Sequence, residues 1–298
     1  MPTPSLLMIP SAFKSGVLAS VLPSDGAGDF TVSRPSTASR VNSDGIIETM
    51  AADVPRLDYT EGGCPVLLTE PQSTNLVKYS EDFTQWVKAR STILSNQAIS
   101  PDGTLNAAKL SPTVSSGSHF IRYGLSITGD NTQSAYVKAA GHNFIQLHSA
   151  QTATDYCNFD ILNGVVGTFG SAVESANIED LGNGWFRCSA HITTGSNGLL
   201  IGLVASNSAG YGAGYDALNT TDGVYIFGAV NEPLSYVTSY IKTEGTTATR
   251  LADVVTVAPP AGVTEIIETI DGVEQAPITT IPATYSVPVG NINSIEMN

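Results

Sequence analysis

The chain has 298 residues, of which 42% are hydrophobic and 13% are charged, and its formal net charge is −14. The apolar content is sufficient to bury a core, so a chain that is disordered throughout is excluded. The acidity and the scattered Lys and Arg residues exclude a nucleic-acid-binding surface. No apolar run is long enough to span a membrane. The abundant Gly, Ser, Thr, Val and Ile favour strands joined by turns.

Residues 1–76 are expected to form an irregular β region, because Pro and Gly interrupt every short apolar run. The apolar run that follows Lys14 has no small-residue cleavage site after it, so we expect no signal peptide. Three arginines share this region with three acidic residues: Arg34, Arg40 and Arg56 with Asp44, Asp58 and Glu70. We expect internal ion pairs here; the alternative is separate solvated charges that contribute little.

Residues 77–258 are predicted to form a β-sandwich resembling a jelly roll, because alternating segments recur along them. The expected strands are 134–140, 142–150, 156–161, 185–193, 199–205 and 224–230. Three Asn-Gly pairs follow or separate these segments, at Asn163-Gly164, Asn183-Gly184 and Asn197-Gly198. Because both residues tolerate positive φ, each pair predicts a hairpin turn.

Residues 259–298 are predicted to form a short β segment. It opens with Pro259-Pro260, and Asp271-Gly272 predicts a hairpin. Such a segment is too small to be stable alone. We therefore expect it to dock on the N-terminal region or on a neighbouring subunit.

Alternation along the expected strands assigns side chains to two faces. In 185–192, Phe186, Cys188, Ala190 and Ile192 suit the core, so the residues between them point the other way. The non-core positions carry the aromatic, amide, Arg and His side chains that bind sugars. The candidate glycan-binding residues are Tyr136, Phe144, Gln146, His148, Asn158, Trp185, Arg187 and His191. The alternative is that this face covers the sheet or packs against a sister subunit.

No catalytic motif, metal site or cofactor site is predicted. His142, His148 and His191 are spread over two expected strands and lack carboxylates at ligand spacing. The chain contains no nucleophile elbow and no zinc-protease motif. Acidic pairs such as Glu179/Asp180 occur in any acidic chain, so no hydrolase is expected. Cys64, Cys157 and Cys188 are odd in number and widely spaced, which predicts buried reduced thiols.

Several segments of the chain resemble one family of proteins. They are Phe30–Arg34, Ser36–Asn42, Val54–Tyr59, Gly63–Pro65, Glu70–Gln72, Thr74–Leu76, Tyr79–Phe83, Ser100–Thr104, Asn183–Arg187, Thr238–Ile241 and Thr249–Asp253. These segments are similar to those of phage head-spike, head-fibre and tail-fibre proteins, and residues 77–258 resemble jelly-roll carbohydrate-binding modules. Pro35 and Ser39 depart from the family pattern, where a small residue and Thr are usual.

The resemblance implies a structural protein on the virion surface, a head or tail fibre or a spike, rather than an enzyme. Its implied partners are other virion proteins, sister subunits in a homotrimer, and host-surface glycans. Two alternatives stay open: a secreted glycan-binding module, for which no export signal is evident, and a polysaccharide depolymerase.

Overall fold

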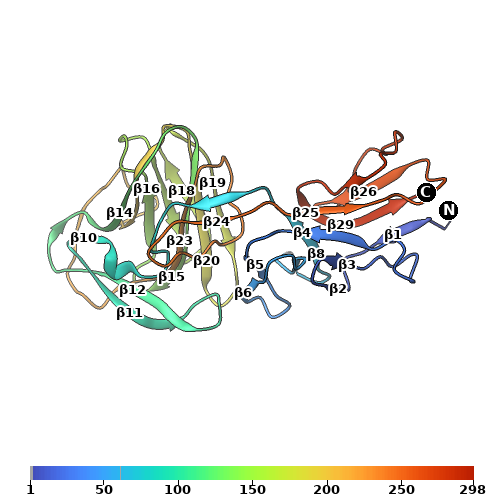
Figure 1. The fold of residues 1–298 in the computed structure, drawn as a ribbon. Coiled ribbons are helices and arrows are strands. Elements are labelled where there is room, and N and C mark those ends of the chain that lie inside the picture. The colour runs from blue at the N-terminus through green and yellow to red at the C-terminus, as the bar shows by residue number, and fades with distance from the viewer. Residues whose placement is uncertain (1–2, 61) are drawn as a thin grey trace. The chain divides into compact units, whose positions relative to one another are not determined.

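The computed structural model describes residues 3–60 and 62–298 and divides into two compact units (Figure 1). The terminal unit comprises Met1–Gln72 and Arg250–Asn298, and the sandwich unit comprises Ser73–Thr249. Segment 259–298 therefore shares a unit with the N-terminal region. The sandwich starts and ends at these boundaries rather than at residues 77 and 258, because the strand Val254–Val257 pairs within the terminal unit.

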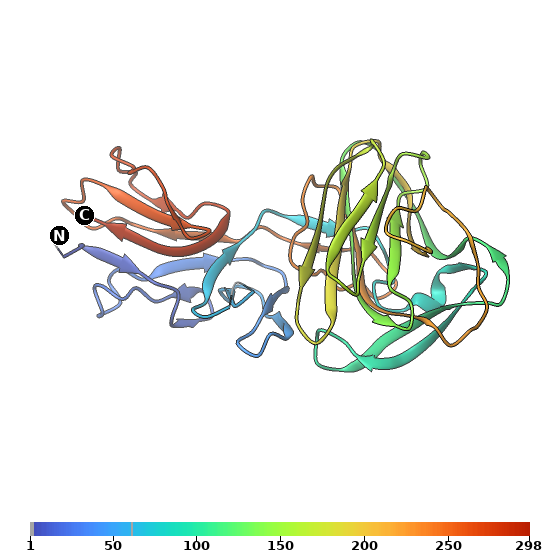
Figure 2. The ribbon, with the colours of Figure 1, turned by 180° about the vertical axis from the view of Figure 1, so that it is seen from behind.

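The sandwich unit consists of two six-stranded antiparallel sheets (Figures 1 and 2). The front sheet runs in the order β10 (Val87–Ala89), β14 (His119–Ile127), β21 (Ser196–Leu203), β16 (Phe144–His148), β17 (Tyr156–Asp160) and β18 (Val165–Phe169). The back sheet runs in the order β11 (Ser91–Ile99), β12 (Leu105–Pro112), β23 (Gly223–Glu232), β15 (Asn131–Ala140), β20 (Trp185–Ile192) and β19 (Val173–Asp180). The chain crosses repeatedly between the sheets, as in a jelly roll. The predicted mostly-β sandwich is confirmed.

Short elements complete the sandwich unit. They are β9 (Ser73–Asn75), β13 (Ser116–Gly117), β22 (Tyr215–Asp216), β24 (Ala248–Arg250), whose last residue belongs to the terminal unit, and the 3-10 turn η1 (Phe83–Gln85). The turn begins at Asp82, whose carboxylate accepts a hydrogen bond from the backbone N–H of Thr84. In the described part of the chain this turn is the only helical element, and no helix there has the length and hydropathy to cross a bilayer.

Two of the three Asn-Gly predictions in the sandwich are confirmed. Asn163-Gly164 joins β17 to β18, and Asn183-Gly184 joins β19 to β20 with both residues at positive φ. The prediction for Asn197-Gly198 is wrong, because both residues lie inside β21, where Gly198 pairs with Gly124 of β14. Neighbouring strand residues, rather than the dipeptide, decide the conformation there.

The core of the sandwich unit lies between the two sheets. Phe186, Cys188, Ala190 and Ile192 are buried in it, as alternation predicted. The side chains of Trp185, Arg187, Ser189 and His191 are also buried, so the outer face of β20 is covered too. Because β20 is buried on both faces, other segments of the chain must cover the face of this strand that points away from the core.

The terminal unit is built from strands of both chain ends. One sheet contains β1 (Leu6–Met8), β7 (Leu57–Asp58), β8 (Val66–Thr69), β26 (Ile266–Ile270), β27 (Val273–Glu274) and β29 (Gly290–Met297). A second contains β2 (Phe13–Lys14), β3 (Val17–Leu18), β4 (Phe30–Ser33), β25 (Val254–Val257) and β28 (Tyr285–Ser286), and β5 (Ala38–Val41) pairs with β6 (Ile47–Met50).

Pairing between the chain ends holds this unit together. Strand β29 pairs with both β1 and β8, and β25 pairs with β4. The predicted Asp271-Gly272 hairpin is confirmed, because it joins the paired strands β26 and β27. The segment 259–298 thus docks on the N-terminal region of its own chain.

Buried ion pairs connect the same chain segments. Arg56 pairs with Glu70 at 2.6 Å, and Glu70 also pairs with Arg250 at 2.5 Å. Asp253 pairs with Arg34 at 2.9 Å and with Arg56. All three guanidinium groups are fully buried.

The expected ion pairs are confirmed in part. Arg56 and Glu70 are partners, whereas Arg40 pairs with Glu48 on the neighbouring strand. Asp58 accepts a backbone hydrogen bond from Val41. Asp253 lies far along the chain from its partners Arg34 and Arg56, so sequence proximity could not identify it.

The three cysteines are free thiols. Cys157 and Cys188 are buried as predicted, and burial raises the pKa of Cys157 to about 12. The prediction for Cys64 is wrong, because this residue is exposed. It lies directly after Gly62 and Gly63, which adopt positive φ in a loop rather than in a strand.

Candidate functional site

The eight predicted glycan-binding residues lie on two different sheets. Phe144, Gln146 and His148 belong to β16 and Asn158 to β17, all in the front sheet. The other four, Tyr136, Trp185, Arg187 and His191, belong to β15 and β20 in the back sheet. Their neighbours along each strand fill the shared core, so the two groups point to opposite outer faces. They do not form one surface.

The back-sheet group packs under other segments of its own chain. Arg187 stacks 5.2 Å from the ring centre of Tyr136 and donates a hydrogen bond to the carbonyl oxygen of Thr238 at 2.7 Å. The ring of Tyr240 contacts that of Tyr136 edge-on, with centres 5.9 Å apart. Trp185 donates its indole N–H to the carbonyl oxygen of Ile99 at 3.1 Å. These side chains therefore fasten the segment around residues 238–240 and the end of β11 at Ile99 to strands β15 and β20.

His191 is the fourth residue of the back-sheet group. Its ring nitrogens lie 3.6 Å from the carboxylate of Asp130 and 3.7 Å from that of Glu174, and these contacts become ion pairs only when the imidazole is protonated. The His191 side chain is buried, whereas both carboxylates are largely exposed. Screening by solvent keeps such pairs weak.

In the front-sheet group, Gln146 and Asn158 anchor the loop at residues 205–214. Gln146 donates to the carbonyl oxygen of Gly210 at 3.0 Å and accepts the N–H of Gly212 at 2.7 Å. Asn158 donates to the carbonyl oxygen of Ala209 at 2.7 Å. Both amides are fully buried, so they hold the loop rather than contact a ligand. The loop at residues 205–214 is therefore tied to the sheet.

A groove lies on the outer face of the front sheet beside this loop. Strand register places Val87, Arg122, Leu200 and His148 in one row across four strands. These residues line a hollow of about 410 Å³ together with Ser118, Phe120, Ala150, Tyr211 and Gly212. We call it the His148 groove.

The aromatic rings of the His148 groove surround its histidine. The centre of the Tyr211 ring lies 4.9 Å from that of His148, and the Phe120 ring lies 6.5 Å from it, both edge-on. Tyr211 is held in this place by the loop that Gln146 and Asn158 anchor. The two anchors thus position an aromatic side chain at the rim.

Polar groups also point into the His148 groove. Burial lowers the pKa of His148 to about 4; Asp155 opposes the shift and Arg122 adds to it. The imidazole is therefore neutral at pH 7. Among the described residues, neither Nδ1 of His148 nor Nε of Arg122 has a hydrogen-bond partner, while Nη2 of Arg122 donates to the carbonyl oxygen of Asn197 at 2.9 Å. The groove lining thus includes one fixed guanidinium and one neutral imidazole.

Sequence reasoning found one residue of the His148 groove and missed the others. Phe120 and Arg122 alternate with the buried Ile121 in β14, so alternation could have identified them. Tyr211 lies in a loop without periodicity, and only the folded loop brings it beside His148. In the parts of the chain that the structure describes, no three His, Cys, Asp or Glu side chains gather as metal ligands.

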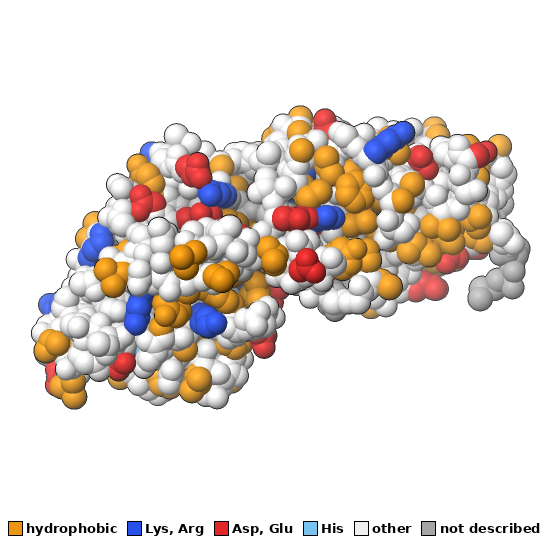
Figure 3. All heavy atoms as spheres, turned by 90° about the horizontal axis from the view of Figure 1, so that it is seen from below, with side chains coloured by type: hydrophobic (Ala, Val, Ile, Leu, Met, Phe, Trp, Pro, Cys, Tyr) orange, Lys and Arg blue, Asp and Glu red, His pale blue; other side chains and the backbone are white. Residues whose placement is uncertain are grey.

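Figure 3 shows Lys and Arg side chains scattered singly among acidic and apolar ones on the face it draws.

No protein-family model matches the chain, and no curated protein matches it in sequence. The residues and geometry of the chain itself are therefore what support a function.

Proposed function

We propose that this chain is a structural protein of a bacteriophage particle, a head or tail fibre or a spike, whose sandwich unit binds a glycan of the host surface. The resemblance of the N-terminal sequence to phage spike and fibre proteins supports the virion location. The observation that carries glycan binding is the His148 groove, in which aromatic rings surround polar groups on the outer face of a sheet.

This combination suits a sugar ring for two physical reasons. The C–H faces of a pyranose pack against aromatic side chains such as Tyr211 and Phe120. Its hydroxyl groups require fixed donors and acceptors, which the guanidinium of Arg122 and the neutral imidazole of His148 supply. The Ser118 hydroxyl already donates to the carbonyl oxygen of Gly212 at 2.5 Å, so its oxygen can serve as an acceptor. A volume of about 410 Å³ lies within the usual range of small-ligand sites.

In this proposal the terminal unit attaches the chain to other virion proteins. Its two sheets contain strands from both the N-terminal and the C-terminal segment. The sandwich unit is therefore an insertion between residues 72 and 250 of the terminal unit. The chain assembles as a homotrimer, since fibres are commonly closed cyclic assemblies. Light scattering of the purified chain tests this part, and a stable monomer at micromolar concentration would refute it.

Two experiments test the virion location and the glycan contact separately. Mass spectrometry of purified particles should detect the chain, and its absence from them would refute the location. A glycan array should show binding that Tyr211→Ala weakens and Tyr236→Ala leaves unchanged, because Tyr236 is an exposed tyrosine outside the groove lining. Equal loss in both variants, or no binding by the unaltered chain, would refute the groove.

Two further measurements distinguish the alternative functions from the proposed one. Release of reducing ends from a bound polysaccharide would indicate a depolymerase, and accumulation of the chain outside uninfected cells would indicate a secreted module. The proposed function predicts neither result.

A further inference from the structure

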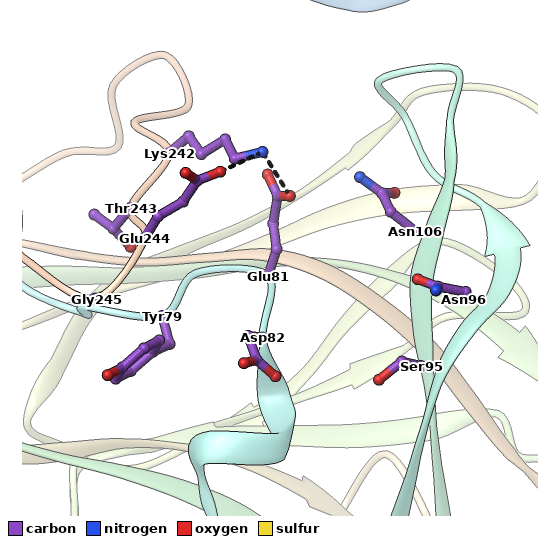
Figure 4. A pocket seen from close by; sticks show the side chains of 10 residues that line it. All are labelled: Tyr79, Glu81, Asp82, Ser95, Asn96, Asn106, Lys242, Thr243, Glu244 and Gly245. Atoms are coloured by element: carbon purple, nitrogen blue, oxygen red, sulfur yellow. Dashed lines mark ion pairs between the residues drawn. The ribbon is translucent and has the colours of Figure 1, made fainter.

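A second hollow in the sandwich unit, which we call the Glu81 pocket, has a volume of about 460 Å³. One wall comes from residues 79–82 and 242–245, and the other from residues 95, 96 and 106 on strands β11 and β12 (Figure 4). It shares no lining residue with the His148 groove. In Figure 4 the side chains of Asn96 and Asn106 face Glu81 and Asp82 across the hollow.

The first wall carries fixed charges. The ammonium of Lys242 lies 3.2 Å from the Glu81 carboxylate and 3.0 Å from that of Glu244, as the dashed lines in Figure 4 mark. The Tyr240 hydroxyl donates to the other Glu81 oxygen at 2.8 Å. Burial alone would lower the pKa of Lys242, but both glutamates outweigh it and raise the pKa. Three carboxylates, with Asp82, face one ammonium, so the lining carries an excess of negative charge.

The second wall offers amide groups. The Nδ2 of Asn106 donates to Asp102 at 2.9 Å, which fixes the orientation of this amide. Its Oδ1 is buried, and no group of the described chain donates a hydrogen bond to it. The Asn106 amide therefore has a fixed position on this wall.

Asn96 lines the same wall as Asn106 and lies at a register shift in β11. The register between β11 and β12 shifts between Leu94 and Ala98, and Asn96 has φ 57°. Such bulges re-aim side chains, and here the Asn96 amide lines the pocket. The aromatic ring of Tyr79 lines the same hollow, and a Cβ built at Gly245 would lie 3.8 Å from this ring.

We propose that the Glu81 pocket is a second ligand site, and that its ligand is a sugar bearing hydroxyl or amino groups and no carboxylate, sulfate or phosphate. The Tyr79 ring offers a packing surface for the sugar. Carboxylate and amide oxygens accept hydrogen bonds from hydroxyl or ammonium groups. The excess negative charge repels an anionic sugar. This site depends neither on virion location nor on the His148 groove.

NMR titration of the full chain with glucose, glucosamine and glucuronate tests the proposal. Glucose and glucosamine should shift resonances of residues 79–82 and 242–245 saturably, and glucuronate should bind at least about tenfold more weakly, which corresponds to about 1.4 kcal/mol. Saturable shifts at the groove alone, no binding of either sugar, or glucuronate binding equal to that of glucose would overturn it.

Matched variants assign the effect to the pocket. Asn96→Gly removes the amide without harming the fold, since glycine favours positive φ, and should weaken binding about three- to tenfold. Asn183→Gly makes the same change at another exposed Asn with φ 53° and should leave the affinity unchanged. Equal affinity of Asn96→Gly and the unaltered chain would count against the site. Tyr211→Ala distinguishes the two sites, because it should remove binding at the His148 groove and leave the saturable shifts of residues 79–82 and 242–245 unchanged.

Discussion

Arg56 and Asp253 form a buried ion pair, although 197 positions separate them in the chain. The same carboxylate pairs with Arg34, so one acidic side chain from the C-terminal part contacts two guanidinium groups from the N-terminal part. The pairing lies within the terminal unit, beside the strand pair β4 and β25. It joins segments that the whole sandwich separates in the sequence.

Asp253→Asn is expected to destabilise the terminal unit by about 3–5 kcal/mol, because removal of one partner leaves buried charge uncompensated. Urea unfolding followed by circular dichroism measures the change. Glu48→Gln is the control, since the Arg40–Glu48 pair is partly exposed and should contribute less than about 1 kcal/mol. Equal effects of the two variants would contradict a buried network.

Acid should destabilise the sandwich unit through His148. Its pKa is about 4 in the folded chain and 6.5 in its ordinary state, so the unfolded chain binds the proton more readily. The stabilisation is fully present above pH 6.5 and is lost as the pH falls through 4, up to about 3 kcal/mol. Thermal unfolding between pH 4 and 7 should show this loss.

His148→Gln isolates that contribution, because glutamine does not titrate while the chain's carboxylates still do. The variant should show a flatter dependence of stability on pH than the unaltered chain. Identical slopes would mean that His148 is not the group responsible.

Gln146→Leu should loosen the loop that carries Tyr211. The change removes both bonds to Gly210 and Gly212, and should speed hydrogen exchange at the Gly212 amide by about tenfold or more. Gln151→Leu changes an exposed glutamine and should leave that amide protected. Unchanged exchange in Gln146→Leu would show that the loop is held by other contacts.

A thiol reagent should modify Cys64 alone in the folded chain. Cys64 is exposed, whereas Cys157 and Cys188 are buried and burial raises the pKa of both, so little reactive thiolate is present at either. Intact mass should show one adduct under native conditions and three in urea. Cys64→Ser should give none while folded, and any native adduct in that variant would contradict burial.

Local pattern predicted much of the sandwich. The segments 156–161 and 185–193 lie on strands with the predicted inner faces, because alternation depends only on neighbours along one strand. The turns at Asn163-Gly164 and Asn183-Gly184 followed from backbone preference. The same preference failed at Asn197, where pairing with β14 determined the conformation.

The sequence by itself therefore determined the β class, most strand positions and the inward side chains, since these are properties of short segments. Only the tertiary structure decided which sheet each strand joins, and so placed His148 and Arg187 on opposite outer faces. It also decided which outer side chains are covered, because loops from distant parts of the chain lie over them. For the same reason Asp253 reaches Arg56: long-range pairing of β4 with β25 brings the two chain ends together.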